Sequence, residues 1–171
     1  SNKKMPASTY HKLNNPAWYS LAETHKDFAV GDNEIKRYQK DTAPFLAYPP
    51  GEEDAFIQPD QFIEVNESFF IIGDLPALPN NYHVESRLLC VQMICTLVVI
   101  TNTTAVIEEL GETDDTQMTG LINLVQPGYY KPGTRLMGDY YGIRHNGQLI
   151  SMTGERIRMN GFTEISAVVT H

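Results

Sequence analysis

The stretch that most constrains the fold is the last one, from Tyr140 to His171, where two Asn-Gly pairs separate three apolar runs. Asn-Gly readily takes the positive φ angles that a tight hairpin turn needs. Asn146-Gly147 and Asn160-Gly161 are therefore predicted turns. The sequence predicts three consecutive antiparallel strands in this stretch.

The middle run of the three contains a change of phase. Its first apolar side chains, Ile150 and Met152, have even numbers, whereas Ile157 and Met159 have odd ones. Successive side chains of a strand point to opposite faces, so a slip of one residue across Gly154 indicates a β-bulge.

Composition indicates a globular chain with an uneven charge. The chain has 171 residues, 42% of them hydrophobic, which is enough for one generous domain or two small ones. From Pro127 onward there are five basic and three acidic side chains, a balance of +2. The net charge of the whole chain is −8, so the other 126 residues carry −10. This acidic balance argues against a nucleic-acid binder, and an anionic ligand would favour the C-terminal part.

The two cysteines, Cys90 and Cys95, lie in one apolar run, and we expect them to be buried free thiols of a reducing compartment. No signal peptide and no apolar run of membrane-spanning length is evident from sequence. We therefore expect a cytoplasmic protein without membrane contact. No His or Cys has the spacing of a metal site, so no metal is predicted.

Several elements are expected before residue 103. Asn15-Pro16 is typical of a helix start and would place Trp18 and Leu21 on one face. The other expected elements are a turn at Gly31–Asn33, a strand Ile35–Tyr38, a helix start at Glu52–Asp54, a buried strand Ser68–Ile72 and a long strand Glu85–Ile94.

The pattern resets around Thr101–Thr104, and we predict two regions, 1–103 and 104–171. The second begins with a short strand, Ala105–Leu110. Thr113 or Asp114 would then cap an amphipathic helix that ends at Gln126–Gly128. Its apolar side would carry Met118, Leu121, Ile122 and Val125.

Four segments together resemble the GNAT superfamily of acetyl-CoA-dependent N-acetyltransferases, and within it the subgroup with an N-terminal GNAT-like half. They read NPAWYSL, VQMIC, IEELGETDDTQMTGLINLVQPGYY and GIRHNGQLISMTGERIRMNGFTEISAVVTH, and the last is the most specific. The resemblance implies an α+β fold with a mixed, mostly antiparallel sheet flanked by helices. Region 1–103 would be the GNAT-like N-terminal part and 104–171 the first part of the catalytic domain.

The resemblance also implies where acetyl-CoA would bind. In the family, the strand matching Ala167, Val168, Val169 and Thr170 offers backbone groups to the pantetheine arm. One N–H near Val168 or Val169 would face the thioester oxygen. The family continues with a Gly-rich loop and a helix N-terminus that hold the pyrophosphate. His171 is the last residue of this sequence, so the resemblance implies that the chain stops before that loop, with an incomplete C-terminal half.

Glu164 is the candidate general base, because an acid at this strand position can take a proton from the acceptor amine in some family members. The alternative is a salt bridge with Arg156 or Arg158 across the hairpin. Glu155, at the expected bulge, allows the same two interpretations.

By the same resemblance, Tyr129, Tyr130 and Arg135 line the acceptor pocket. The alternative for them is an ordinary amphipathic surface loop. The acceptor would be a small-molecule or peptide amine.

Two functions follow. The first is an N-acetyltransferase in which an amine attacks acetyl-CoA directly. The second is a non-catalytic GNAT-like binding or interaction module. The sequence leaves the oligomeric state open.

Overall fold

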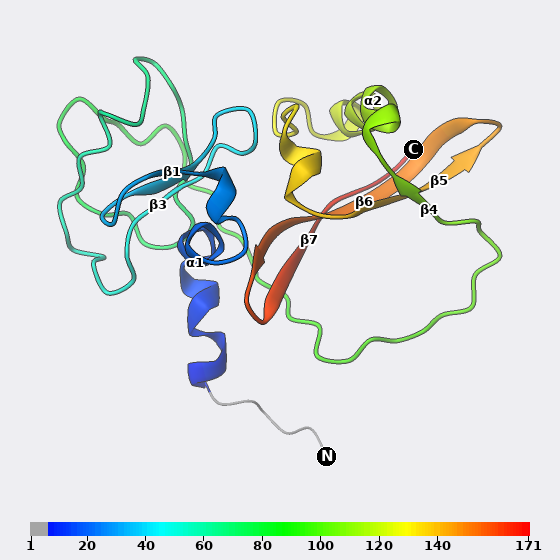
Figure 1. Cartoon of the computed structure of the whole chain (residues 1–171), viewed down its shortest axis with the longest axis horizontal. Helices are drawn as coiled ribbons and strands as arrows, with labels where there is room; N and C mark the ends of the chain where they lie inside the picture. Colours follow the sequence, from blue (N-terminus) through cyan, green and yellow to red (C-terminus); the bar gives the residue numbers. More distant parts are fainter. Residues whose placement is uncertain (1–6) are drawn as a thin grey trace.

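Two antiparallel sheets organise the chain (Figure 1). The computed structural model describes residues 7–171. The first sheet contains, in order, β1 (Ala29–Gly31), β2 (Lys36–Tyr38) and β3 (Leu46–Ala47). The second contains, in order, β4 (Glu108–Leu110), β5 (Tyr140–His145), β6 (Gln148–Met159) and β7 (Phe162–Thr170). With few helices beside these sheets the fold is α+β, as the sequence predicts.

Within residues 7–171, two α-helices and four 3-10 helices accompany the sheets. They are η1 (Ala7–Asn14), α1 (Pro16–Ala22), η2 (Lys26–Phe28), η3 (Glu112–Asp114), α2 (Asp115–Val125) and η4 (Thr134–Met137). Helix α1 begins after Asn15 as predicted, but the Asn15 amide donates to the carbonyl oxygen of Tyr48 at 2.7 Å instead of capping the helix. Helix α2 buries Met118, Leu121 and Ile122 and leaves Val125 exposed.

Both predicted hairpin turns are confirmed. Asn146 and Gly147 have φ angles of 50° and 78°, the positive values that a tight two-residue turn needs. Gly161, in the second turn, has a φ angle of 93°. These turns fix β5, β6 and β7 as neighbours in the sheet.

The predicted slip around Gly154 is confirmed as two register shifts between β6 and β7. Between Met152 and Gly154 the extra residue lies in β7, where Ala167 has a φ angle of 51°. Between Glu155 and Arg158 the extra residue lies in β6. The second shift produces the change of parity that the sequence displays, and the first opens a bulge in β7.

Strand β6 belongs to two cores. Its first half packs Leu149 and Met152 with α2 and Val169, and its second half packs Ile157 and Met159 with α1 and β2. The second core also contains Ala17, Leu21, Tyr38, Ala43, Phe45, Ala47 and Met137. This core therefore joins residues from both sides of position 103. The boundary between regions 1–103 and 104–171 stays a prediction.

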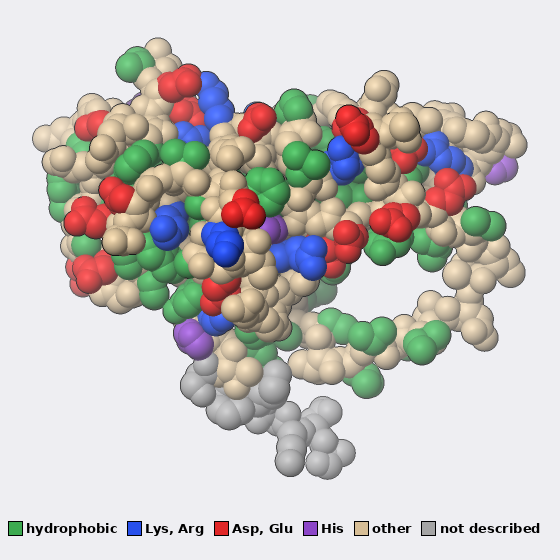
Figure 2. Space-filling model, viewed as in Figure 1, with side chains coloured by type: hydrophobic (Ala, Val, Ile, Leu, Met, Phe, Trp, Pro, Cys, Tyr) green, Lys and Arg blue, Asp and Glu red, His purple; other side chains and the backbone are tan. Residues whose placement is uncertain are grey.

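Three expected elements of the N-terminal region are wrong. The segment 85–107 contains no strand and is exposed along its whole length, and Figures 1 and 2 show it standing away from the body. Cys90 and Cys95 are consequently exposed thiols and not buried ones. Glu52–Asp54 lies in turns, not at a helix start, and of Ser68–Ile72 only Phe70 forms a β-bridge, to Phe45.

A missing strand partner explains the largest of these differences. Apolar, β-branched residues fit a pleated surface, but a strand is stabilised only by the neighbours it pairs with. The side chain of Gln92 donates to the carbonyl oxygen of Leu13 at 2.8 Å, whereas no strand within residues 7–171 pairs with this segment. Among the helices of the same described part, none is long and apolar enough to cross a membrane.

Gly154 is required because the ring of Tyr140 lies over it. A Cβ added at Gly154 would meet Tyr140 Cε1 at 2.2 Å. We predict that Gly154→Ala lowers the free energy of unfolding by about 1–3 kcal/mol, the usual cost of overpacking. The measurement is urea denaturation.

The matched control is Gly120→Ala in α2, where an added Cβ meets nothing within 4 Å. There we expect stabilisation of about 0.5–1 kcal/mol, since Ala favours the helix interior over Gly. Equal effects of the two substitutions would contradict the close approach of Tyr140.

Candidate active site

Strand β7 forms one edge of the described four-stranded sheet and carries the bulge. The His171 N–H donates to Ile150 O at 2.8 Å, so this pair is a hydrogen-bonded one. Because such pairs alternate along an antiparallel ladder, the backbone of Val169 faces β6 and that of Thr170 faces away from it. The open side of β7 therefore presents backbone groups that β6 does not use.

The bulge adds to this open edge. Ala167 and Val168 together lie opposite one residue of β6, and Ala167 takes the left-handed conformation that is unfavourable for a residue with a Cβ. Val168 is 72% exposed, whereas Val169 is buried beside Met152. Strain of this kind is concentrated at functional sites, which makes the bulge a candidate ligand-binding feature.

Glu164 lies in the bidentate ion pair that the sequence offered as its alternative role. Arg156 donates from Nε to Oε2 at 2.9 Å and from Nη2 to Oε1 at 2.7 Å. The Arg156 guanidinium also lies over the ring of Phe45, 4.9 Å from its centroid. The Glu164 side chain remains 39% exposed, so one side of the carboxylate is open to solvent.

Glu155 has a structural role in the loop that precedes β5. Its Oε2 accepts from the Asp139 N–H at 3.0 Å and pairs with Arg158 at 3.4 Å. Gly138 packs so closely that an added Cβ would meet the Glu155 Cβ at 2.4 Å. The Glu155 carboxylate therefore holds this loop against β6.

Tyr130 lines a surface hollow, Arg135 is joined to it through Asp115, and Tyr129 lies outside its lining. The hollow has a volume of about 390 Å³ and is lined by Asp115, Thr116, Thr119, Tyr130 and Pro132. Arg135 Nε donates to Asp115 Oδ1 at 2.7 Å. Tyr129 instead stacks on Phe70, with ring centroids 6.1 Å apart.

Two buried phenols lie beside this hollow. Tyr130 and Tyr140 are packed edge to face, 6.1 Å apart, and neither hydroxyl has a hydrogen-bond partner among the described residues. Burial raises the pKa of Tyr140 to about 12 and also raises the pKa of Tyr130. Both phenols are therefore protonated at neutral pH and can donate to a ligand or a water molecule.

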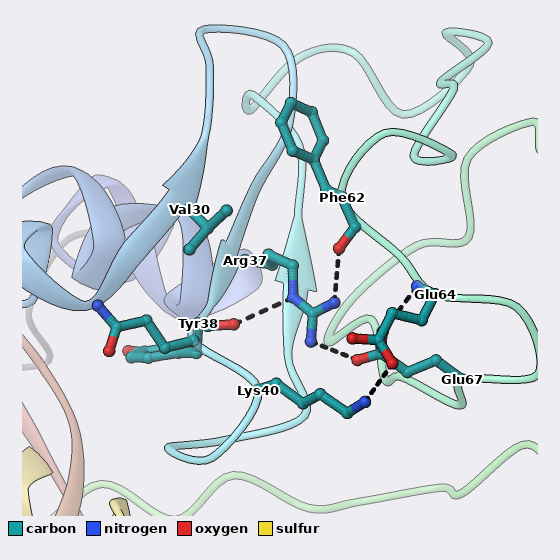
Figure 3. A pocket seen from close by; sticks show the side chains of 8 residues that line it. Val30, Arg37, Tyr38, Lys40, Phe62, Glu64 and Glu67 are labelled. Carbon is teal, nitrogen blue, oxygen red and sulfur yellow. Dashed lines mark hydrogen bonds and ion pairs between the residues drawn. The ribbon is translucent and has the colours of Figure 1, made fainter.

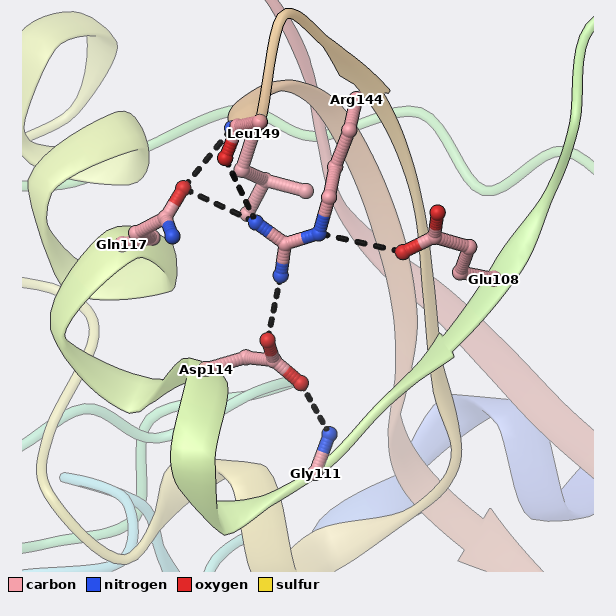
Figure 4. A network of polar contacts seen from close by, with 7 residues as sticks. Glu108, Gly111, Asp114, Gln117, Arg144 and Leu149 are labelled. Atoms are coloured by element: carbon pink, nitrogen blue, oxygen red, sulfur yellow. Dashed lines mark hydrogen bonds and ion pairs between the residues drawn. The ribbon is translucent and has the colours of Figure 1, made fainter.

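Arg144 fixes the helix that lines the hollow (Figure 4). It donates from Nε to Glu108 in β4 at 3.1 Å, from Nη1 to Gln117 in α2 at 3.0 Å, and from Nη2 to Asp114. The other Asp114 oxygen accepts from the Gly111 N–H at 2.8 Å. One guanidinium thus joins β4, β5 and the start of α2.

A second hollow, of about 160 Å³, lies beside the first sheet (Figure 3). Its buried Arg37 already donates to Glu67 at 2.5 Å and to the carbonyl oxygens of Phe62 and Tyr38. Lys40 pairs with Glu64 at its rim. Because Arg37 and Lys40 already pair with groups of the protein itself, we interpret this hollow as a structural feature and not as a binding site.

On the face that Figure 2 shows, acidic and basic side chains lie interspersed. This face therefore has no continuous basic patch of the kind that binds a polyanion. Among residues 7–171, no group of three or more His, Cys, Asp or Glu side chains could hold a metal ion. The candidate site is therefore built from backbone groups, phenols and the Arg156–Glu164 pair.

Sequence reasoning missed Tyr140 and Asp115 as site residues. Tyr140 begins a strand, and the residue that would have identified its position is Gly154, which leaves room for its ring. Asp115 follows the predicted cap, Thr113 or Asp114, and no sequence pattern distinguishes it, yet it lines the hollow.

The chain is similar to a protein of known structure. No protein-family model matches the chain, and no curated protein matches it. That structure is a crystal structure of a protein from Novosphingobium aromaticivorans DSM 12444 that is named as an acetyltransferase from the GNAT family. The TM-score is 0.75 at 30% sequence identity, and the match covers 94% of this chain and 71% of that chain.

A buried hydrogen-bond network around His25 joins the N-terminal region to η4 and β6. His25 Nε2–H donates to the carbonyl oxygen of Met137 at 2.7 Å, and Nδ1 lies 3.0 Å from both Ser20 Oγ and the Tyr38 hydroxyl. Ser20 Oγ donates to Arg158 O at 2.6 Å. Burial lowers the pKa of His25, the nearby Arg158 charge lowers it further, and the Met137 carbonyl opposes both.

The depressed pKa predicts a pH dependence of stability. Below the unfolded pKa of about 6.5 the unfolded chain binds a proton that folded His25 does not, so stability falls as pH decreases. The His25 contribution has a slope of at most about 1.4 kcal/mol per pH unit. Urea denaturation between pH 7.5 and 5.5 measures it.

His25→Gln is the matched variant, since its amide can donate to Met137 O but does not titrate. It should be less stable at pH 7.5 and show a flatter slope over the same range. An unchanged slope would rule out His25 as the source.

Proposed function

The chain belongs to the GNAT family of acetyltransferases, and on this premise we propose that it transfers an acetyl group from acetyl-CoA to an amine. The observation that carries the proposal is the open, bulged edge of β7 at Ala167 and Val168. An extended ligand with alternating amide groups can pair with such an edge as an added strand. The pantetheine arm of acetyl-CoA is a ligand of this kind.

The β7 backbone would align the thioester. Ala167, Val168, Val169 and Thr170 are the proposed cofactor-binding residues, with the outward backbone groups of Thr170 and the backbone of the bulge residue Val168 pairing with the pantetheine amides. A backbone N–H at the bulge, which is fixed in place before the reaction, would donate to the thioester oxygen as negative charge develops on it. The pyrophosphate loop of the family follows the strand that corresponds to β7, so these residues supply the thioester-aligning part of the site.

The reaction is a direct displacement. The amine nitrogen attacks the thioester carbon, the C–S bond breaks, and coenzyme A leaves as the thiolate. The amine proton passes to Glu164, directly or through water. Each Glu164 oxygen accepts one hydrogen bond from Arg156, and a carboxylate has about four acceptor sites. The exposed side of Glu164 can therefore still accept a proton.

The acceptor amine would be bound at the hollow by Tyr130, with Arg135, Asp115 and Tyr140 beside it and Tyr129 on the same loop, outside the lining. Asp115 lines the hollow and keeps one oxygen beyond its bond from Arg135, so it can pair with a cationic acceptor. The acceptor is proposed to be a small-molecule or peptide amine.

One observation favours a second candidate, a non-catalytic GNAT-like binding module. The bidentate bond from Arg156 gives Glu164 a structural role that needs no reaction. The two candidates differ in whether removal of the Glu164 charge affects turnover.

We predict that Glu164→Gln in the protein as its gene encodes it lowers kcat about 100-fold or more, the effect of losing a general base. The KM for acetyl-CoA should change little, because the β7 backbone remains. The measurement is thiol release from acetyl-CoA with a panel of primary amines.

Glu155→Gln is the control, since it removes a carboxylate from the same strand region without touching Glu164. Equal loss in both variants would contradict a base at Glu164. Absence of transfer by the wild type to every amine would favour the binding module.

A further inference from the structure

A row of aromatic rings connects the first sheet with the loop that follows α2. Tyr38 packs on Phe45 at 6.4 Å, Phe45 on Phe70 at 6.4 Å, and Phe70 stacks on Tyr129 at 6.1 Å with an interplanar angle of 25°. The first three rings belong to the N-terminal region, and Tyr129 belongs to the proposed acceptor loop. The row therefore ends at Tyr129, next in sequence to Tyr130, which lines the hollow.

Phe45 supports the Arg156–Glu164 pair. Its ring is nearly fully buried and lies beneath the Arg156 guanidinium, which makes a cation–π contact with it. The ring face and the two hydrogen bonds to Glu164 together fix the plane of the guanidinium. Loss of the ring would leave the pair held from one side only.

Phe70 supports Tyr129 on a rigid backbone. The Phe70 N–H donates to Pro44 O at 2.7 Å, and Phe70 O accepts from the Leu46 N–H at 2.9 Å. Tyr129 itself lies in a stretch without regular structure and is 46% exposed. The stacking on Phe70 thus ties a loop residue to a part of the fold that is hydrogen-bonded on both sides.

The N-terminal region also anchors the end of the same loop. The Gly133 N–H donates to Asp41 O at 2.7 Å, and Thr134 Oγ1 donates to Thr42 O at 2.7 Å. An added Cβ at Gly133 would meet Asp41 O at 2.8 Å, so the two backbones are in direct contact. The loop 126–133 is consequently held at its end and at Tyr129 by residues before position 103.

We infer that the N-terminal region forms part of the acceptor site, with Phe45 positioning the Arg156–Glu164 pair and Phe70 positioning Tyr129. The inference rests on the proposed function, which assigns Glu164 and Tyr129 to that site. Phe45 and Phe70 are positioning residues, because each acts through another side chain.

The test compares Phe70→Leu with Phe69→Leu in the protein as its gene encodes it. Phe69 is the neighbouring residue of the same type, but it packs with Tyr82 in a different core. Loss of the stacking energy of one aromatic pair changes an equilibrium constant by roughly twofold to tenfold. Phe70→Leu should raise the KM for the acceptor amine by this factor and leave kcat and the KM for acetyl-CoA unchanged. Phe69→Leu should change none of the three.

Phe45→Leu should lower kcat, because the Arg156–Glu164 pair loses its support, and Phe70→Tyr should restore the acceptor KM because it keeps a ring. Hydrogen exchange of the amides in 126–133 gives a readout without turnover. Exchange should become about two to ten times faster in Phe70→Leu and stay at the wild-type rate in Phe69→Leu.

Unchanged loop exchange and an unchanged acceptor KM in Phe70→Leu would overturn the inference. An equal rise in the acceptor KM in Phe69→Leu would also overturn it, because the effect would then be general destabilisation. If the wild type transfers acetyl to no amine while loop exchange rises only in Phe70→Leu, the proposed function fails and the positioning of Tyr129 by Phe70 is supported.

Discussion

The structure depends on one strand, β6, that packs into two cores at once. Leu149 and Met152 pack in one core with α2, whereas Ile157 and Met159 pack in another with α1 and Tyr38 of β2. A regular strand could not serve both with this sequence, because the apolar positions change parity between the two halves. The extra residue between Glu155 and Arg158 makes the change possible, and the compensating extra residue in β7 produces the bulge at Ala167. The bulge in the edge proposed to bind acetyl-CoA thus lies opposite the strand that serves both cores.

The same strand explains which parts of the fold were predictable from sequence. The turns at Asn146 and Asn160 and the slip at Gly154 are local patterns with a direct backbone meaning, and all three are confirmed. The expected strand Glu85–Ile94 is wrong, because apolar content alone does not supply a neighbouring strand to pair with. The exposure of Cys90 and Cys95 follows from that single difference.

The candidate site was predictable only where its residues are close together in the sequence. Glu164 and Arg156 face each other across a short hairpin, so their ion pair could be anticipated as one of two roles. Tyr140 over Gly154, Asp115 beside Arg135, and the row from Tyr38 to Tyr129 each bring together residues from separate elements. No local pattern carries such information, since it arises from packing between elements that are far apart in the sequence.

The central claim is that the outward backbone groups of β7 bind acetyl-CoA as an added strand. Amide hydrogen exchange of Val168, Val169 and Thr170, measured with and without saturating acetyl-CoA in the protein as its gene encodes it, tests this claim most directly. The claim predicts slower exchange, by about twofold to tenfold for one added hydrogen bond, at Val168 and Thr170. Val169, whose backbone already faces β6, should change little. Binding of acetyl-CoA with unchanged exchange at Val168 and Thr170 would contradict the claim.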